Sequence, residues 1–252
     1  MCRALTVCLA ALAALFAVAD EIAEMSQAEA ISTILNSRNA CGKSKFDRAV
    51  ALVSREAAAG KPLQQFVIGL TSDDRELSAK YLDAARERIR ALAEKKNNPL
   101  AWYLLSMEKN DFSCLKRAAD GGNVQALNAL GTIATQEAFG RNTISSNALE
   151  RILRRSYECF HRAAKQRDAN ALVNLGTCYL RGFGVAQDMA LAFECYRVAA
   201  ERGHPEGMDN MSACYQFGHG IPKDMEKSLY WRMRARAVRG DEAAQKWLKE
   251  RK

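Results

Sequence analysis

The stretch that decides the fold is residues 169–200, with the sequence ANALVNLGTCYLRGFGVAQDMALAFECYRVAA. Near its start, Ala171, Leu175 and Cys178 follow one another at intervals of four and three residues. This spacing brings apolar residues onto one face of an α-helix. The stretch therefore predicts a first helix over about 170–180, and we refer to helices of this kind as A helices.

Glycine ends this helix, and an acidic residue precedes the next one. Gly182 and Gly184 tolerate the positive φ of a tight reversal. Asp188 can cap a second helix by accepting hydrogen bonds from its free amides. We expect this second helix, a B helix, over about 189–202, with a glycine to stop it at Gly203. Its inward residues are expected to be Ala192, Cys195, Tyr196 and Ala199.

The helix pair recurs along the chain. A Leu-Gly or Met-Ser pair stands at positions 130, 175 and 211, and Cys114, Cys159 and Cys195 repeat the same intervals of 45 and 36 residues. A fourth copy closes the chain between Gly240 and Leu248. Periods of this length are typical of stacked helical repeats. The sequence therefore predicts an all-α fold, an α/α superhelical solenoid of antiparallel helix pairs.

Two of the repeated glycines, Gly131 and Gly176, fall inside expected A helices. Glycine in a helix interior costs about 1 kcal/mol relative to alanine. We expect a compensating close approach of the neighbouring B helix at both positions.

These residues resemble the Sel-one-like repeat family, which is related to tetratricopeptide repeats. One full copy of the family pattern lies in 169–200, and a second runs from Gly207 to Gly240. A third begins at Asn123 but has an insertion at 134–147 in place of the glycine turn. The resemblance implies a bacterial scaffold or adaptor. The first copy is carried by Ala171, Leu175, Gly176, Tyr179, Gly182, Gly184, Val185, Asp188, Ala192, Tyr196, Ala199 and Ala200.

Four segments are expected along the chain. Residues 1–19 form a signal peptide, 20–45 an N-terminal helical cap, 46–122 degenerate helical repeats, and 123–252 the Sel-one-like repeats with a C-terminal capping helix. The alternative is a separate helical domain over 20–100.

The signal peptide is predicted from Arg3, an apolar run over 4–16 and the small residues Ala17 and Ala19. A charged start, a short apolar middle and a small-x-small exit are what the secretory machinery recognises. Cleavage after Ala19 would leave a periplasmic or secreted protein without a transmembrane span, because no later segment is apolar enough. An uncleaved amphipathic anchor is the alternative.

Composition disfavours several classes of function. Only 8% of the residues are aromatic and 3 are histidine, which disfavours a histidine metal site or a stacking platform for nucleic acid. We expect no metal, no cofactor and no nucleic-acid partner. The net charge of +8 becomes +7 without Arg3. The basic stretches at 151–167 and 232–252 are interpreted as solvated helix faces, with an anion-binding patch as the alternative.

Six cysteines remain after processing, an even number that suits disulfides in an exported protein. Cys159 and Cys178 are 19 residues apart, as are Cys195 and Cys214, and each pair stands at similar heights on neighbouring helices. We predict these two bonds. Cys178 with Cys195 fits less well, since their heights differ by about one turn. Alternatively, all the cysteines are buried thiols. The pairing of Cys41 and Cys114 stays open.

No catalytic constellation is evident. The S-x-x-K pattern of penicillin-recognising enzymes occurs at Ser106–Lys109 and Ser113–Lys116, but neither of the accompanying motifs does. The favoured function is a non-enzymatic exported scaffold that binds a protein or peptide on the concave side of the solenoid. An exported β-lactam-binding or hydrolytic enzyme is the alternative. Candidate contacts are the insertion at 134–147 and the A-helix residues Asn128, Asn174, Thr177, Arg181 and Asn210.

Overall fold

A computed structural model of the protein describes residues 27–35, 43–140 and 145–251. Over these residues every helix or strand assigned is an α-helix, thirteen in all, which confirms the all-α prediction. The signal peptide predicted at 1–19 lies outside the described residues. Within these ranges, no helix is both long enough and apolar enough to span a membrane.

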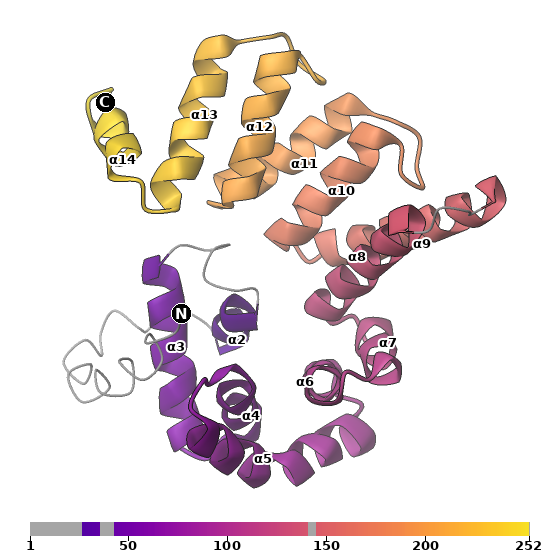
Figure 1. The fold of residues 1–252 in the computed structure, drawn as a ribbon, viewed down its shortest axis with the longest axis vertical. Helices are drawn as coiled ribbons and strands as arrows, with labels where there is room; N and C mark the ends of the chain where they lie inside the picture. The colour runs from indigo at the N-terminus through magenta and orange to yellow at the C-terminus, as the bar shows by residue number, and fades with distance from the viewer. Residues whose placement is uncertain (1–26, 36–42, 141–144, 252) are drawn as a thin grey trace. The chain divides into compact units, whose positions relative to one another are not determined.

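The chain divides into two compact units, the first extending to Gly121 and the second beginning at Gly122. Figure 1 shows the helices of each unit. The first unit contains α2 (Gln27–Leu35), α3 (Lys43–Ala58), α4 (Pro62–Thr71), α5 (Arg75–Lys96), α6 (Pro99–Lys109) and α7 (Phe112–Asp120). The second contains α8 (Val124–Gly140), α9 (Ser146–Ala164), α10 (Ala169–Arg181), α11 (Met189–Glu201), α12 (Pro205–Phe217), α13 (Met225–Val238) and α14 (Glu242–Lys249).

Consecutive helices pack against each other in both units. In the first unit α4 lies on α5 and α6 on α7. In the second, the hairpins α8/α9, α10/α11 and α12/α13 follow one another, and α14 packs on α13. Helices α9 and α10, and likewise α11 and α12, join each hairpin to the next. The second unit is therefore a row of antiparallel helix pairs, as the sequence predicts for a helical-repeat solenoid.

The mid-helix glycines lie where helices approach closely. A Cβ at Gly131 would stand 2.6 Å from the Phe160 ring of α9, and one at Gly176 would stand 2.6 Å from the Tyr196 ring of α11. Such contacts are far shorter than ordinary carbon–carbon packing. The expectation of close approach at these glycines is confirmed, and each A helix packs on an aromatic ring of its own B helix.

The α12/α13 repeat brings its two helices together in another way, because Ser212 stands where the two earlier repeats have Gly131 and Gly176. Its hydroxyl lies 3.0 Å from the hydroxyl of the fully buried Ser228 in α13. A serine pair fits this position because both side chains are small and each hydroxyl satisfies the other. The repeat therefore keeps its close helix contact by a polar pair.

The ends of the B helices follow the sequence prediction. Asp188 accepts a hydrogen bond from the Leu191 amide at 2.9 Å, and Asp224 accepts one from Lys227 at 2.9 Å. The glycines of the preceding turns have positive φ, +70° at Gly182 and +79° at Gly218. These caps and turns fix the reversal from each A helix to its B helix.

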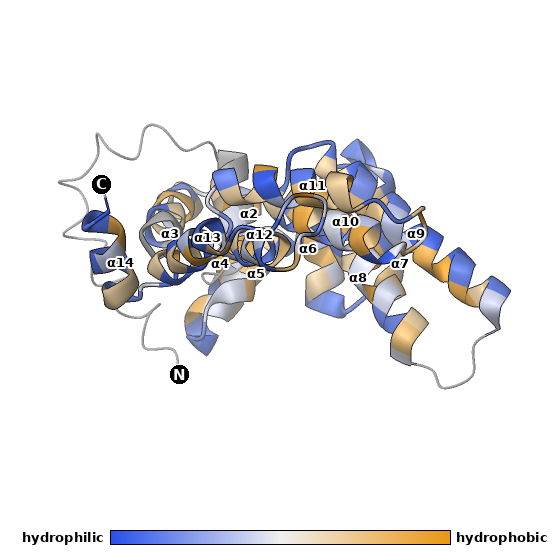
Figure 2. Cartoon of the chain, turned by 90° about the horizontal axis from the view of Figure 1, so that it is seen from above, coloured by the Kyte–Doolittle hydropathy of each residue, from blue (hydrophilic) through white to orange (hydrophobic). Residues whose placement is uncertain are grey.

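The first repeat of the second unit differs from the other two. Its A helix continues to Gly140 and its B helix begins at Ser146, so most of the 134–147 insertion is helical. Polar and apolar residues alternate along the helices of the unit (Figure 2), as expected for helices buried on one side. The insertion lengthens this hairpin relative to α10/α11.

Candidate binding face

Helix α10 has one polar stripe. Apart from Tyr179, its polar side chains are Asn170, Asn174, Thr177 and Arg181, which follow at intervals of four, three and four residues. These intervals place them on one side of the helix. The three uncharged members are half-buried and Arg181 is exposed. None of the four stripe residues is fully buried, although Thr177 contacts Tyr196 of α11 and Asn170 contacts His204.

The next A helix continues this surface. Helix α12 lies beside α10, and the positions 36 residues after the stripe are Glu206, Asn210, Ala213 and Phe217. None of the four is fully buried. We call the eight positions on α10 and α12 together the A-helix face.

Asn174 and Asn210 occupy equivalent places at the centre of this face. Both are half-buried. Within the described part of the chain, neither carboxamide makes a hydrogen bond to another protein group. Each offers one acceptor oxygen and two donor hydrogens to a ligand. The face thus presents two unengaged carboxamides in register.

The N-terminal end of the face is tied together by a histidine. His204 caps α12 by accepting a hydrogen bond from Gly207 through Nδ1, and its Nε2 lies 2.9 Å from Oδ1 of Asn170. The ring is 4% exposed. Burial lowers the pKa of His204 because a charged imidazolium is poorly solvated there. The neutral ring therefore links neighbouring A helices.

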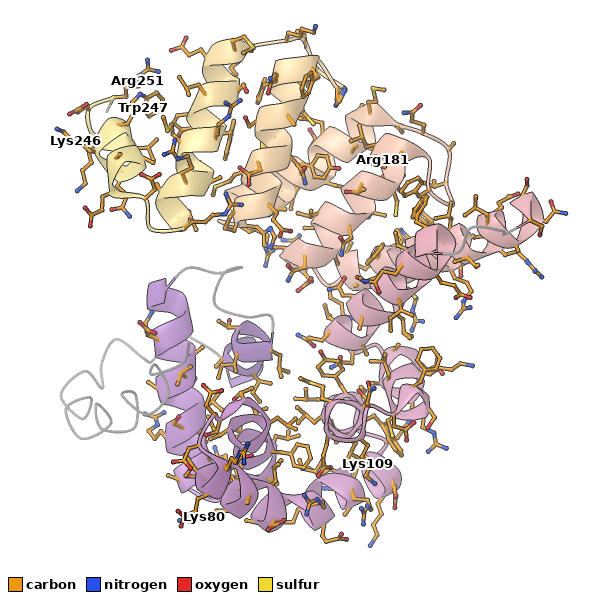
Figure 3. All side chains as sticks on the ribbon, in the orientation of Figure 1. Lys80, Lys109, Arg181, Lys246, Trp247 and Arg251 are labelled. Atoms are coloured by element: carbon orange, nitrogen blue, oxygen red, sulfur yellow. The ribbon has the colours of Figure 1, made fainter. Side chains whose placement is uncertain are left out.

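The C-terminal end of the face carries a cation and an aromatic ring. The Arg181 guanidinium lies 6.0 Å from the centroid of the Phe183 ring, and no described carboxylate pairs with it. Figure 3 shows Arg181 at the end of α10. Phe217, the equivalent residue of α12, is 56% exposed and stacks on His219 at 5.7 Å.

Two of the predicted contact residues are already engaged within the protein. Asn128 Nδ2 donates to Asp168, the cap of α10, at 2.9 Å. Thr177 donates to the Val173 carbonyl or shares its hydroxyl with that of Tyr196. Asn174, Asn210 and Arg181 are the predicted residues that the structure brings onto one accessible face with their polar groups available.

The arrangement of the second unit agrees with a comparison to known families. The model of the Sel1 repeat matches residues 153–168, 169–204 and 205–231. This part of the chain is similar to Sel1 repeats, and we refer to the matched residues as the Sel1 repeats. The matched segments begin within α9 and end within α13. The Sel1 repeats therefore include both helices that form the A-helix face.

Two solved structures resemble the chain. A Sel1 repeat protein from Oxalobacter formigenes is 27% identical, with a TM-score of 0.43, over 50% of this chain and 90% of that one. A protective antigen of uropathogenic Escherichia coli strains, which displays an SLR fold, is 20% identical, with a TM-score of 0.47. That match covers 79% of this chain and 44% of the antigen. No curated protein matches the chain.

No disulfide bond joins Cys159, Cys178, Cys195 and Cys214 in the structure, and the bonds Cys159–Cys178 and Cys195–Cys214 stay predictions. Cys178 is buried with Phe160 and Leu175, and Cys195 packs against this cluster. Burial raises the pKa of Cys178 to about 12, and the nearby Cys195 thiolate contributes. Cys178 and Cys195, the pairing that the sequence disfavoured, are thus the two cysteines that share one hydrophobic cluster.

The serines of the two S-x-x-K patterns precede the Sel1 repeats and bond to other groups. The Ser106 hydroxyl is buried and donates to the Tyr103 carbonyl at 2.6 Å. The Ser113 hydroxyl donates to Asp111 at 2.8 Å. Among the described residues no group of three metal-ligating side chains comes together.

Sequence reasoning missed Phe217 and His204 as parts of the face. Phe217 stands 36 residues after Arg181, so the repeat register could have found it. His204 gave no such signal, because its contact with Asn170 depends on how two Sel1 repeats stack.

Proposed function

We propose that the protein is a non-enzymatic interaction scaffold whose A-helix face binds an extended peptide segment of a protein partner. Sel1 repeats are typically protein-interaction scaffolds, and stacked repeats offer extended binding surfaces. The observation that carries the proposal is the pair Asn174 and Asn210, two carboxamides in equivalent positions without partners in the described part of the chain.

A carboxamide matches a peptide bond chemically. Its oxygen accepts from the peptide N–H and its nitrogen donates to the peptide carbonyl, whatever side chains the peptide carries. Asn174 and Asn210 are half-buried, so an approaching ligand finds them partly desolvated. Bonds made in such a place contribute more than bonds made in open water.

The spacing of the two residues suits an extended chain. Neighbouring packed helices lie about 8–10 Å apart, and an extended peptide advances about 3.3 Å per residue. A peptide crossing from α10 to α12 would therefore meet the two carboxamides at points about three residues apart. Helices α10 and α12 contact each other directly, and His204 at the start of α12 reaches Asn170 of α10.

We propose that the scaffold acts outside the cytoplasm, in the periplasm or after secretion. The basis is the signal peptide predicted at 1–19, which lies outside the described residues. Amino-terminal sequencing of the protein recovered from its native compartment tests this. Asp20 as the first residue is the expected result, and an intact Met1 on exported protein or retention in the cytoplasm would contradict it.

The binding proposal is tested by selecting peptides from a random phage-displayed library on the full chain. Enriched peptides are then titrated against the wild type and the double variant Asn174→Ala/Asn210→Ala. Each lost carboxamide should cost about 1–2 kcal/mol, so we expect affinity to fall by roughly 30-fold or more. Asn110→Gly removes an exposed carboxamide at the end of α6, where the positive φ of 51° suits glycine; it is the matched control and should bind like the wild type. Equal binding by the double variant would refute the proposal.

A further inference from the structure

The charged and apolar groups at one end of the A-helix face point to the chemistry of the peptide. Arg181 closes the stripe on α10, and Phe217 stands at the equivalent place on α12. Because neighbouring packed helices lie about 8–10 Å apart, one short peptide segment can contact both side chains. The two positions follow Asn174 and Asn210 by seven residues each, which is about two helical turns.

Exposed apolar residues gather on this side of the second unit. In the second unit, five of the eight large apolar side chains that are more than a third exposed stand where A helices end or B helices begin; the other three are Ile133, Leu229 and Tyr230. Among the described residues, none stands at the turns over 165–168, 202–204 and 239–241. Isolated exposed apolar residues need no explanation, but a row of them on one edge marks an interaction site. The row consists of Phe139, Met189, Leu191, Phe217 and Met225.

Two cations at this edge have no ion-pair partner among the described residues. Arg181 and Lys223 are exposed, and no described carboxylate lies within ion-pair distance of either. The side chain of Lys223 runs along the turn that follows Phe217, since it comes close to Gly218.

The acidic residues of the same edge already have partners. Asp188 caps α11, and Asp224 caps α13 and pairs with Lys227 at 3.1 Å. Glu226 lies 3.6 Å from Arg251. The cations beside Phe217 are therefore available to a negatively charged ligand.

We infer that the bound peptide carries an acidic side chain next to an apolar one, with Arg181 holding the carboxylate and Phe217 contacting the apolar group. The inference rests on the proposed function and names the chemistry of its partner. Arginine binds a carboxylate through two parallel hydrogen bonds. The Arg181 guanidinium lies over the Phe183 ring, at the C-terminal end of α10.

The experiment compares the peptides selected by the wild type with those selected by charge variants of the full chain. The wild type should enrich Asp or Glu beside Phe, Leu or Met. Arg181→Glu should reverse the preference to Lys or Arg and weaken an acidic wild-type peptide at least tenfold. Arg181→Gln should abolish the charge preference without reversing it, and Phe217→Ser should abolish the apolar one.

The control is Arg155→Glu, which makes the same charge change at an exposed residue of the B helix α9. It should select the wild-type peptides. Selected peptides without acidic enrichment, or an acidic enrichment that survives Arg181→Glu, would overturn the inference while leaving the proposed function intact. A library without any enriched peptide would refute the proposed function, and the inference with it.

Discussion

The close packing of α10 on α11 can be tested by adding one methyl group. In Gly176→Ala the new Cβ would lie 2.6 Å from a ring carbon of Tyr196, which is only 1% exposed. The ring cannot move outward freely because it fills the core between α10 and α11. Its hydroxyl also lies 3.2 Å from that of Thr177, and a displaced ring would lose this contact.

Three contributions set the magnitude. Overpacking a filled core costs about 1–3 kcal/mol, and a lost hydrogen bond costs about 1 kcal/mol. Alanine in place of glycine in a helix returns about 1 kcal/mol. We therefore expect Gly176→Ala to lower the free energy of unfolding by about 1–3 kcal/mol. Gly140→Ala is the control, because nothing lies within 4 Å of its Cβ position; it should be neutral or slightly stabilising.

Urea unfolding followed by far-ultraviolet circular dichroism measures both variants. A further comparison isolates the ring as the cause. In a Tyr196→Ala background the added methyl meets no ring, so Gly176→Ala should raise the unfolding midpoint there instead of lowering it. The reasoning fails if Gly176→Ala is as stable as the wild type, or if it destabilises both backgrounds equally.

Three further predictions concern single residues of the Sel1 repeats. Burial lowers the pKa of His204 below its ordinary value near 6.5, so its contribution to stability is complete above pH 6.5 and is lost as the pH falls toward the folded-state pKa. His204→Gln should show a smaller drop in urea midpoint between pH 7.5 and 5.5 than the wild type; an equal drop would contradict this. Asp188→Ala removes the cap of α11 and should cost about 1 kcal/mol. Asp73→Ala, at an exposed residue outside any helix, should cost almost nothing, and equal midpoints for the two variants would refute the capping role. In protein kept reduced, so that no disulfide blocks the thiol, Cys178, whose pKa burial raises to about 12, should resist iodoacetamide at pH 8 in the native state and react quickly in urea, as peptide mass mapping would reveal; fast native labelling would show that the thiol is accessible.

The parts of the fold that the sequence predicts are those encoded within one repeat. The turn glycines, the caps at Asp188 and Asp224, and the packing glycines Gly131 and Gly176 each act on residues close in sequence or one helix away. Their chemistry follows from backbone conformation and helix periodicity. Backbone conformation and helix periodicity could both be predicted from the residues of the stretch 169–200.

Contacts between repeats were harder to predict. Asn128 was expected to face a partner, but it donates to Asp168 forty residues later, at the start of the next A helix. The link between His204 and Asn170 is of the same kind. Such contacts depend on how neighbouring hairpins stack, and one repeat read alone does not specify that geometry.

The A-helix face also contains residues that the sequence predicted and residues that it did not. Asn174 and Asn210 were predicted as polar residues of the A helices, whereas Phe217 was missed because it is an apolar residue at the position equivalent to Arg181. The 36-residue interval between repeats locates this position in the sequence, but the residue type found there does not suggest a binding role. The role of Phe217 becomes visible only from its exposure.

The central claim is that a peptide binds across α10 and α12, and the side-chain amide signals of asparagine test it most directly. A selected peptide is titrated into ¹⁵N-labelled full-chain protein, with the signals assigned by Asn174→Ala, Asn210→Ala and Asn110→Gly. We predict that the Asn174 and Asn210 side-chain signals shift together and saturate at one dissociation constant, while that of Asn110 stays in place. Saturating binding that leaves the Asn174 and Asn210 signals unmoved would contradict the account.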